Sequence, residues 1–125
     1  MGIRWPEQII LCEVGPRDGL QNEPTMLSAD QKVALIEGVV DAGVRIVEIG
    51  SFVHPKAVPQ MANTDEVAKK FRRVQGVEYR ALVANLKGAE RALTSGITKI
   101  KLTVSASESH AMANLKRTPQ ELIEG

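Results

Sequence analysis

The chain has 125 residues, of which 43% are hydrophobic and 25% are charged, and its formal net charge at pH 7 is +1. This length allows one small hydrophobic core, and the nearly neutral charge gives no reason to expect nucleic acid or an anionic membrane as a partner. No apolar run approaches the length of a membrane span, and the first residues resemble neither a signal nor a transit peptide. We therefore expect a soluble metabolic protein in the cytoplasm of a bacterium.

The first half of the chain is predicted to form two strands with a helix between them. Residues 9–14 are an apolar run typical of a buried parallel strand. Residues 28–31 have a capping-box sequence, which predicts the start of a helix with a broad apolar stripe formed by Val33, Leu35, Ile36, Val39 and Val40. Gly43 is a suitable end for this helix, and the β-branched run at residues 44–49 predicts a second buried strand.

The second half repeats this order. Residues 63–66 form another capping pattern before a helix that is expected to reach Phe71, and residues 79–84 predict a third strand. A third helix is expected over residues 86–94. Residues 95–102 then share with residues 42–49 the order of a small residue, a helix-ending Gly and a β-branched strand. The sequence therefore predicts four β-then-α units.

Repeated units of this kind predict a parallel sheet in which all strands have their carboxyl ends at one edge. We expect that edge to carry Asp18, Glu48, Asn85 and Ser105. An open doubly wound or flavodoxin-like sheet shows the same repeat, so periodicity alone leaves both a half-barrel and an open sheet as alternatives.

The turn after the first predicted strand has the sequence GPRDGLQNE, residues 15–23. Gly15 and Gly19 allow the backbone to turn sharply, so that Arg17 and Asp18 can point together into a site for a metal and an oxyanion. A surface turn with a local ion pair explains these nine residues equally well.

Residues 15–23 resemble the first-strand signature of the hydroxymethylglutaryl-CoA lyases, a family of metal-dependent TIM barrels. Later segments resemble later parts of the same family in the same order, namely residues 47–53, 55–56, 58–61, 85–88 and 105–108 with Asn114. The resemblance runs from about Ile9 to the last residue, which makes it specific. The related acyl-CoA condensing synthases usually carry Glu at the position of Leu20, and this difference favours the lyases.

The resemblance implies an α/β fold, a TIM (β/α)8 barrel, of which this chain would form about the first four β/α units. A complete barrel needs roughly 250 residues, so residues 1–125 are expected to be the amino-terminal part of one catalytic domain. Thr118, Pro119 and Glu121 form a strong helix start close to the end of the chain, which agrees with an incomplete domain. A short natural protein whose last helix ends at Gly125 is the alternative.

The resemblance also implies a reaction, the cleavage of hydroxymethylglutaryl-CoA into acetyl-CoA and acetoacetate. Asp18 would bind Mg²⁺ or Mn²⁺, because a carboxylate is a suitable hard oxygen ligand. Arg17 would be catalytic and would bind substrate, since its guanidinium can stabilise an enolate. Glu48 would be a catalytic residue that orients the metal site, Asn114 would approach the substrate, and Gln21 would contact the substrate or brace Arg17. A structural role is an equal alternative for Glu48 and Gln21.

Four other residues receive no catalytic role. Cys12 lies outside any Gly-rich loop like that of the family's catalytic cysteine, so we expect a small core residue. His54 and His110 are isolated and do not form the family's His-x-His metal pair, so we expect both to be solvated. Glu13 could face either the site or the barrel interior.

Three hypotheses for the function remain. In the first, the full-length protein is a hydroxymethylglutaryl-CoA lyase with an acyl-CoA substrate and, by family likeness, a homo-oligomeric assembly. The family's histidine pair, asparagine ligand and cysteine loop belong to the second half of its barrel, so the isolated chain is expected to be inactive. The second hypothesis is a related acyl-CoA condensing synthase or lyase. The third is a non-catalytic half-barrel that binds a ligand or associates with itself.

Overall fold

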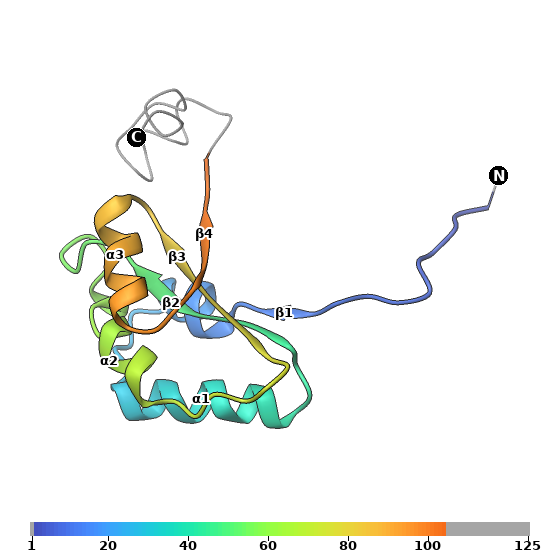
Figure 1. Cartoon of the computed structure of the whole chain (residues 1–125), viewed down its shortest axis with the longest axis horizontal. Coiled ribbons are helices and arrows are strands. Elements are labelled where there is room, and N and C mark those ends of the chain that lie inside the picture. Colours follow the sequence, from blue (N-terminus) through green and yellow to red (C-terminus); the bar gives the residue numbers. More distant parts are fainter. Residues whose placement is uncertain (1, 105–125) are drawn as a thin grey trace.

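The structure is a computed structural model that describes residues 2–104. The sheet is parallel and has the strand order β1-β2-β3-β4, with β1 at Cys12–Glu13, β2 at Ile46–Phe52, β3 at Glu78–Val83 and β4 at Lys99–Leu102. Three helices connect successive strands: α1 (Ala29–Asp41), α2 (Thr64–Lys70) and α3 (Leu86–Thr94) (Figure 1). The predicted parallel sheet and the predicted alternation of strands and helices are confirmed for residues 2–104, and the helix expected to start at Thr118 lies outside them. Among residues 2–104, no helix has the length and apolar content needed to cross a membrane.

Helix α1 begins and ends as its sequence predicts. The Ser28 side chain accepts a hydrogen bond from the backbone N–H of Gln31 at 3.2 Å, and the Gln31 side chain accepts one from the backbone N–H of Ser28 at 2.9 Å. Gly43 follows the helix with a φ of 103°, a conformation that glycine adopts without strain. Local chemistry is therefore sufficient to define this helix.

Helix α2 differs from its prediction at both ends. Asn63 makes no side-chain capping bond to α2, because its amide is used elsewhere: its Nδ2 donates to the Leu27 carbonyl at 3.2 Å, and its Oδ1 accepts from Lys32 at 2.6 Å. At the other end α2 stops at Lys70, and Phe71 is already extended. The tertiary contacts of Asn63 replace the local cap that its sequence predicts.

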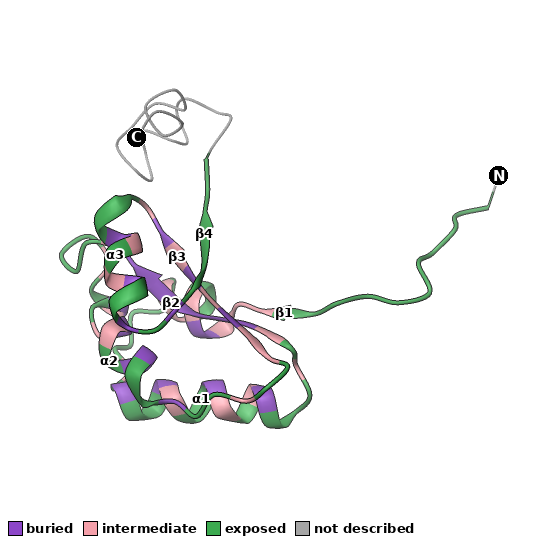
Figure 2. Cartoon of the chain, in the orientation of Figure 1, coloured by how far each residue is buried: buried purple, intermediate pink, exposed green. Residues whose placement is uncertain are grey.

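The hydrophobic core lies between the sheet and the helices (Figure 2). Buried core residues come from all three helices, from β2 and β3, and from the loops between them: Ile36, Val40, Val47, Ile49, Phe52, Val67, Ala68, Phe71, Tyr79, Ala81, Val83, Ala92 and Ile97. Removing these side chains from water is the main force that holds the helices against the sheet.

Strand β1 is shorter than predicted. It contains Cys12 and Glu13 alone, and the apolar residues before it are 65–79% exposed: Ile9, Ile10 and Leu11. In the described part of the chain, β1 pairs with β2 and has no strand on its other side. Within this part, residues 9–11 therefore have no neighbouring strand to pair with and no layer of side chains over them. Figure 1 shows this segment extending away from the sheet. Cys12 is exposed, so the expectation of a core residue was wrong.

Strand β2 runs further than predicted and contains an irregularity. Glu48 pairs with Arg80, Gly50 with Ala81 and Ser51 with Leu82, so the register shifts between Glu48 and Gly50. A bulge of this kind places residues three apart on the same face of the sheet, here Glu48 and Ser51. Glu48 therefore lies within β2, not at its carboxyl end as predicted, because the strand continues to Phe52.

Gly50, which follows this shift, faces helix α2. A Cβ atom at this position would lie 2.8 Å from the Thr64 Cγ2 atom, and Thr64 is buried. The glycine thus allows α2 to approach the strand closely. The opposite face of the sheet, away from α1, α2 and α3, carries Glu48, which Arg17 contacts.

Candidate functional site

The turn η1 (Gly15–Gly19) positions the two charged residues of the predicted motif. The backbone N–H groups of Arg17 and Asp18 both donate to the Val14 carbonyl, at 3.1 and 2.7 Å. The Glu13 side chain accepts a hydrogen bond from the backbone N–H of Gly15 at 2.8 Å. Glu13 therefore stabilises the turn directly after β1. The turn directs the Arg17 side chain toward β2.

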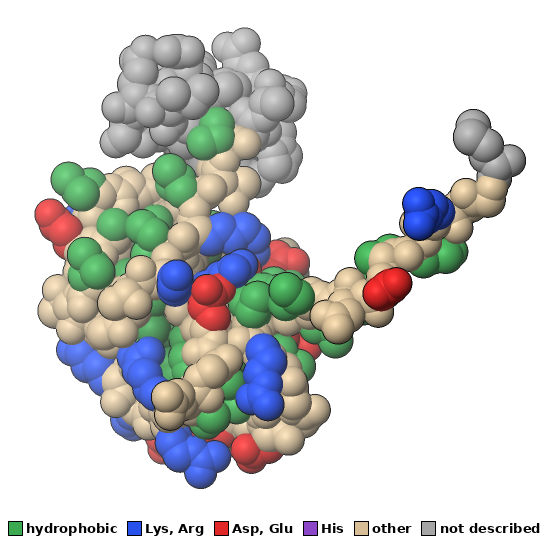
Figure 3. Space-filling view, turned by 45° about the vertical axis from the view of Figure 1, so that its right-hand side comes forward, with side chains coloured by type: hydrophobic (Ala, Val, Ile, Leu, Met, Phe, Trp, Pro, Cys, Tyr) green, Lys and Arg blue, Asp and Glu red, His purple; other side chains and the backbone are tan. Residues whose placement is uncertain are grey.

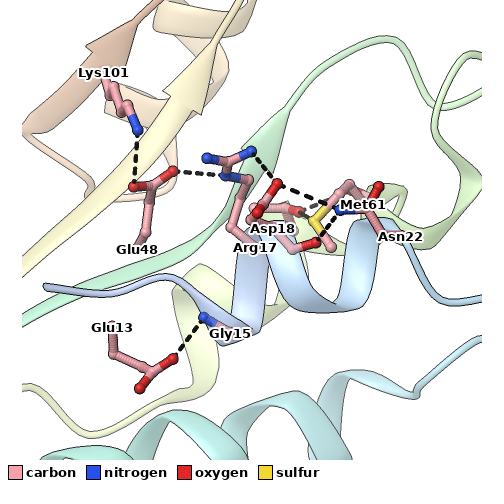
Figure 4. A network of polar contacts seen from close by, with 9 residues as sticks. Glu13, Gly15, Arg17, Asp18, Asn22, Glu48, Met61 and Lys101 are labelled. Carbon is pink, nitrogen blue, oxygen red and sulfur yellow. Dashed lines mark hydrogen bonds and ion pairs between the residues drawn. The ribbon is translucent and has the colours of Figure 1, made fainter.

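Arg17 and Glu48 form the centre of the site (Figure 4). Arg17 Nε donates to Glu48 Oε1 at 2.6 Å, and the two side chains are 13% and 2% exposed. Arg17 Nη1 also lies 3.2 Å from Asp18 Oδ1. Short charge-assisted bonds in a protected position are stronger and more directional than surface ion pairs. The turn and β2 are thus joined by a partly buried ionic contact.

Asp18 lies on the accessible side of the turn, with a side chain that is 54% exposed. Asn22 supports it, since the Asn22 Nδ2 donates to the Asp18 carbonyl at 2.8 Å and lies 3.5 Å from Oδ1. Neither Arg17 nor Asn22 uses Asp18 Oδ2 in these contacts. An exposed carboxylate oxygen of this kind fits a hard divalent cation. Within residues 2–104, no group of three or more His, Cys, Asp or Glu side chains is arranged to hold a metal.

The other predicted site residues have different surroundings. The Gln21 side-chain oxygen is buried and has no hydrogen-bond partner within the described residues, so it does not brace Arg17. Asn85 caps α3, because its side chain accepts from the Gly88 N–H at 2.9 Å. His54 is exposed, and its Nδ1 accepts from the Lys56 N–H at 3.2 Å. Asn114, like Ser105 and His110, lies outside the described residues.

Comparisons with known proteins show the family of the chain. The family model described as HMGL-like matches residues 8–125. The chain belongs to the HMGL-like family. It is 42% identical to hydroxymethylglutaryl-CoA lyase YngG of Bacillus subtilis over 119 residues, which cover 95% of this chain and 40% of that protein. It is 43% identical, with the same coverage, to a 3-hydroxy-3-isohexenylglutaryl-CoA/hydroxy-methylglutaryl-CoA lyase of Pseudomonas aeruginosa.

Solved structures of HMGL-like lyases give the same result for the fold. The Bacillus subtilis HMG-CoA lyase matches with a TM-score of 0.94 and 40% identity, covering 98% of this chain and 41% of that chain. An HMG-CoA lyase from Acinetobacter baumannii, in complex with coenzyme A and 3-methylmalate, matches with a TM-score of 0.90 and 40% identity, covering 93% and 38%. The predicted family and TIM-barrel fold are confirmed, and the chain spans about two-fifths of the length of these relatives.

Lys101 of this HMGL-like chain is a further residue of the site, which was not predicted from the sequence. Its Nζ lies 3.5 Å from Glu48 Oε2, so a residue of β4 reaches the same carboxylate as Arg17. Alternation along β4 is the signal that could have found it, because Lys99 and Lys101 are two residues apart and therefore share a face of the strand.

Lys32 was also overlooked. This residue of α1 is 2% exposed, and its Nζ donates to the Gln60 carbonyl and, at 2.6 Å, to Asn63 Oδ1. Burial lowers the pKa of the Lys32 ammonium below its ordinary value. Lys32 is one helical turn before the buried Ile36, so its position within the apolar stripe was the available signal. The loop between β2 and α2 is thus fastened to α1.

Proposed function

We propose that this chain is the amino-terminal part of the catalytic domain of a carbon–carbon lyase that cleaves hydroxymethylglutaryl-CoA to acetyl-CoA and acetoacetate. The observation that carries the proposal is the Arg17–Glu48 contact of 2.6 Å, which holds a guanidinium beside the exposed carboxylate of Asp18. Membership of the HMGL-like family and the lyase relatives support the reaction assigned to this arrangement.

The chemistry requires a cation where negative charge develops. The carbon–carbon bond breaks, its electron pair moves onto the thioester side as an enolate, and the tertiary alcohol, after losing its proton, becomes the ketone of acetoacetate. Addition of one proton to the enolate carbon then gives acetyl-CoA. Arg17 would stabilise the enolate oxygen with a guanidinium N–H, and Glu48 would hold the guanidinium at the required angle. Gln21, whose buried oxygen lacks a partner within residues 2–104, would contact the substrate, and so would Asn114.

A divalent cation, Mg²⁺ or Mn²⁺, completes the proposal. Asp18 would be its ligand from this chain, because its carboxylate is exposed and Oδ2 is not used by Arg17 or Asn22. The bound cation would polarise the oxygens of the substrate. The remaining ligands would come from outside residues 2–104, which contain no group of three suitable side chains.

The assembly and the location belong to the same proposal. We infer a homo-oligomer in the bacterial cytoplasm that acts on acyl-CoA compounds, in leucine degradation or a related route. Lyases from Bacillus subtilis and Pseudomonas aeruginosa support the bacterial setting, and the Acinetobacter baumannii lyase bound to coenzyme A supports the substrate class.

The test uses the purified full-length protein that contains this chain. Hydroxymethylglutaryl-CoA is added after treatment with EDTA, and then again with Mg²⁺ or Mn²⁺, while acetyl-CoA and acetoacetate are measured separately. We expect equal amounts of both products, formed only when the metal is present. Free coenzyme A together with 3-hydroxy-3-methylglutarate, and no acetoacetate, would indicate thioester hydrolysis and would contradict the proposed cleavage.

A second candidate function is a lyase with a larger acyl substrate. The Pseudomonas aeruginosa relative is described as a lyase for 3-hydroxy-3-isohexenylglutaryl-CoA as well as for the hydroxymethyl compound. Parallel assays of both thioesters with the same enzyme preparation distinguish the two candidates through the ratio of their kcat/KM values. A ratio in favour of the isohexenyl compound would assign the protein to the larger substrate.

A further inference from the structure

The open face of the sheet carries charged side chains where a barrel interior is usually apolar. The cross-strand pairs on this face include Glu48 with Arg80 and Arg80 with Lys99, and the next level contains Leu82 with Lys101. Charged side chains of both signs also lie together on the surface seen in Figure 3. Lys99 and Lys101 therefore offer two cations of one strand at successive levels of the same face.

The two lysines have different partners. Lys101 Nζ lies 3.5 Å from Oε2 of Glu48, whose side chain is 2% exposed. Lys99 Nζ lies 3.8 Å from Oε1 of Glu78, whose side chain is 28% exposed. An ammonium beside a buried carboxylate affects that carboxylate far more than one beside a hydrated carboxylate. Lys101 is thus connected to the site through Glu48, and Lys99 is not.

Glu48 has a different cation on each of its oxygens. Arg17 approaches Oε1 from the turn after β1, and Lys101 approaches Oε2 from β4, as Figure 4 shows. With Asp18, the cluster contains two carboxylates and two cations, so its charges balance. Arg17 reaches Glu48 through Nε and Asp18 through Nη1, and neither contact uses Nη2. The guanidinium is therefore held by one N–H toward Glu48 and not by a two-bond fork.

We propose that Lys101 is a positioning residue of the lyase site. It prevents Glu48 from forming a bidentate pair of hydrogen bonds with Nε and Nη2 of Arg17, and Nη2 therefore stays available to the substrate. This inference rests on the proposed function. A carboxylate that is free at its second oxygen pairs with Nε and Nη2 of an arginine in a bidentate geometry, which is the strongest contact open to it. Lys101 occupies that second oxygen. Loss of the ammonium would allow the carboxylate to rotate and to take the remaining N–H.

The decisive variant is Lys101→Met in the full-length protein, which removes the charge and retains a long side chain. We expect kcat to fall about tenfold with little change in KM, since a donor is withdrawn from the transition state while the guanidinium stays in place. Affinity for Mn²⁺ is expected to stay unchanged, because Lys101 does not contact Asp18. Lys101→Arg should restore most of the activity, and the matched control Lys99→Met should keep kcat within about twofold of the wild type.

A structural readout separates this inference from the proposed function. Crystal structures of the wild type and of Lys101→Met would show whether a second Arg17–Glu48 hydrogen bond appears in the variant. Appearance of the bond supports the inference, even if the wild type fails to cleave hydroxymethylglutaryl-CoA, a result that would overturn the proposed function alone. An unchanged single contact, or equal loss of activity in Lys101→Met and Lys99→Met, would overturn the role of Lys101.

Discussion

Arg17 and Glu48 are separated by 31 positions in the chain, yet the Nε and Oε1 atoms of their side chains are 2.6 Å apart. The contact links the turn after β1 to the interior of β2, and Lys101 adds a residue of β4 to the same carboxylate. Residues of the turn, of β2 and of β4 therefore meet at one carboxylate, although β3 lies between β2 and β4 in the sheet.

Arg17→Gln in the full-length protein is expected to lower kcat by a factor on the order of 10² to 10³, as for the loss of one oxyanion donor. Gln keeps a polar side chain at the turn but removes the positive charge that matters most when the enolate forms. Steady-state kinetics with hydroxymethylglutaryl-CoA measures the effect, and circular dichroism checks the fold. Turnover close to that of the wild type would remove Arg17 from the mechanism.

Asp18→Asn is expected to weaken binding of Mg²⁺ or Mn²⁺ without changing the secondary structure. Asn retains the shape and one oxygen, but it lacks the charge that attracts a hard cation. Because the Asp18 side chain is 54% exposed, the substitution leaves few buried polar groups without a hydrogen-bond partner. Isothermal titration of both proteins with Mn²⁺ provides the measurement. Equal affinities would show that Asp18 is not a direct ligand.

Glu48→Gln is expected to reduce the free energy of unfolding by about 2 kcal/mol, somewhat less than is typical when one member of a fully buried ion pair is removed. Arg17 then keeps its charge in a position that is only 13% exposed, without the carboxylate that balanced it. Urea denaturation of the full-length protein gives the value.

Glu78→Gln is the matched control for Glu48→Gln, because Glu78 also pairs with basic residues of β3 and β4, Arg80 and Lys99, but is 28% exposed. The loss in the free energy of unfolding for Glu78→Gln should stay below about 1 kcal/mol. Similar costs for the two variants would mean that burial of Glu48 does not strengthen its contacts.

Lys32→Met is expected to destabilise the protein by about 1–3 kcal/mol at neutral pH, because the Gln60 carbonyl and Asn63 Oδ1 lose their donor. Urea denaturation at about pH 7 measures this loss. A variant as stable as the wild type would mean that this buried contact contributes nothing to the fold.

The same variant tests the lowered pKa of Lys32, whose ordinary value is 10.5. Between the lowered pKa and 10.5 the unfolded chain binds more protons at Lys32 than the folded protein does, so this residue makes stability rise with pH in that window. The stability of the wild type relative to Lys32→Met should therefore increase as the pH rises toward 10.5. A difference that stays constant or decreases would contradict the lowered pKa.

Residues 1–125 alone are expected to self-associate or to fold loosely, and to show no lyase activity with Mg²⁺ or Mn²⁺. Apolar side chains at both edges of the sheet are exposed, including Leu11 at 65% and Leu102 at 54%. Sedimentation velocity and a coupled acetyl-CoA assay test the two parts. A compact, stable monomer would favour a self-contained open sheet, and turnover would contradict the assigned metal chemistry.

Sequence by itself was sufficient for features that depend on neighbouring residues. The capping box of Ser28 and Gln31, the left-handed Gly43 and the turn that carries Arg17 and Asp18 all appear where the sequence predicts them. Their chemistry is local, since each needs a partner only a few positions away in the chain. The order of strands and helices follows from the same kind of signal, and so does the family, through its motifs.

Tertiary structure decided the features that depend on distant partners. Asn63 has the sequence of a helix cap but bonds to Leu27 and Lys32, and Glu48 lies within β2 because the strand continues past a register shift. Alternation along β4 places Lys101 on the same face as Lys99, but it does not indicate which of the two ammonium groups lies beside Glu48. Such pairings arise only when the parallel sheet forms, because strand register places side chains from separate units next to one another on one face.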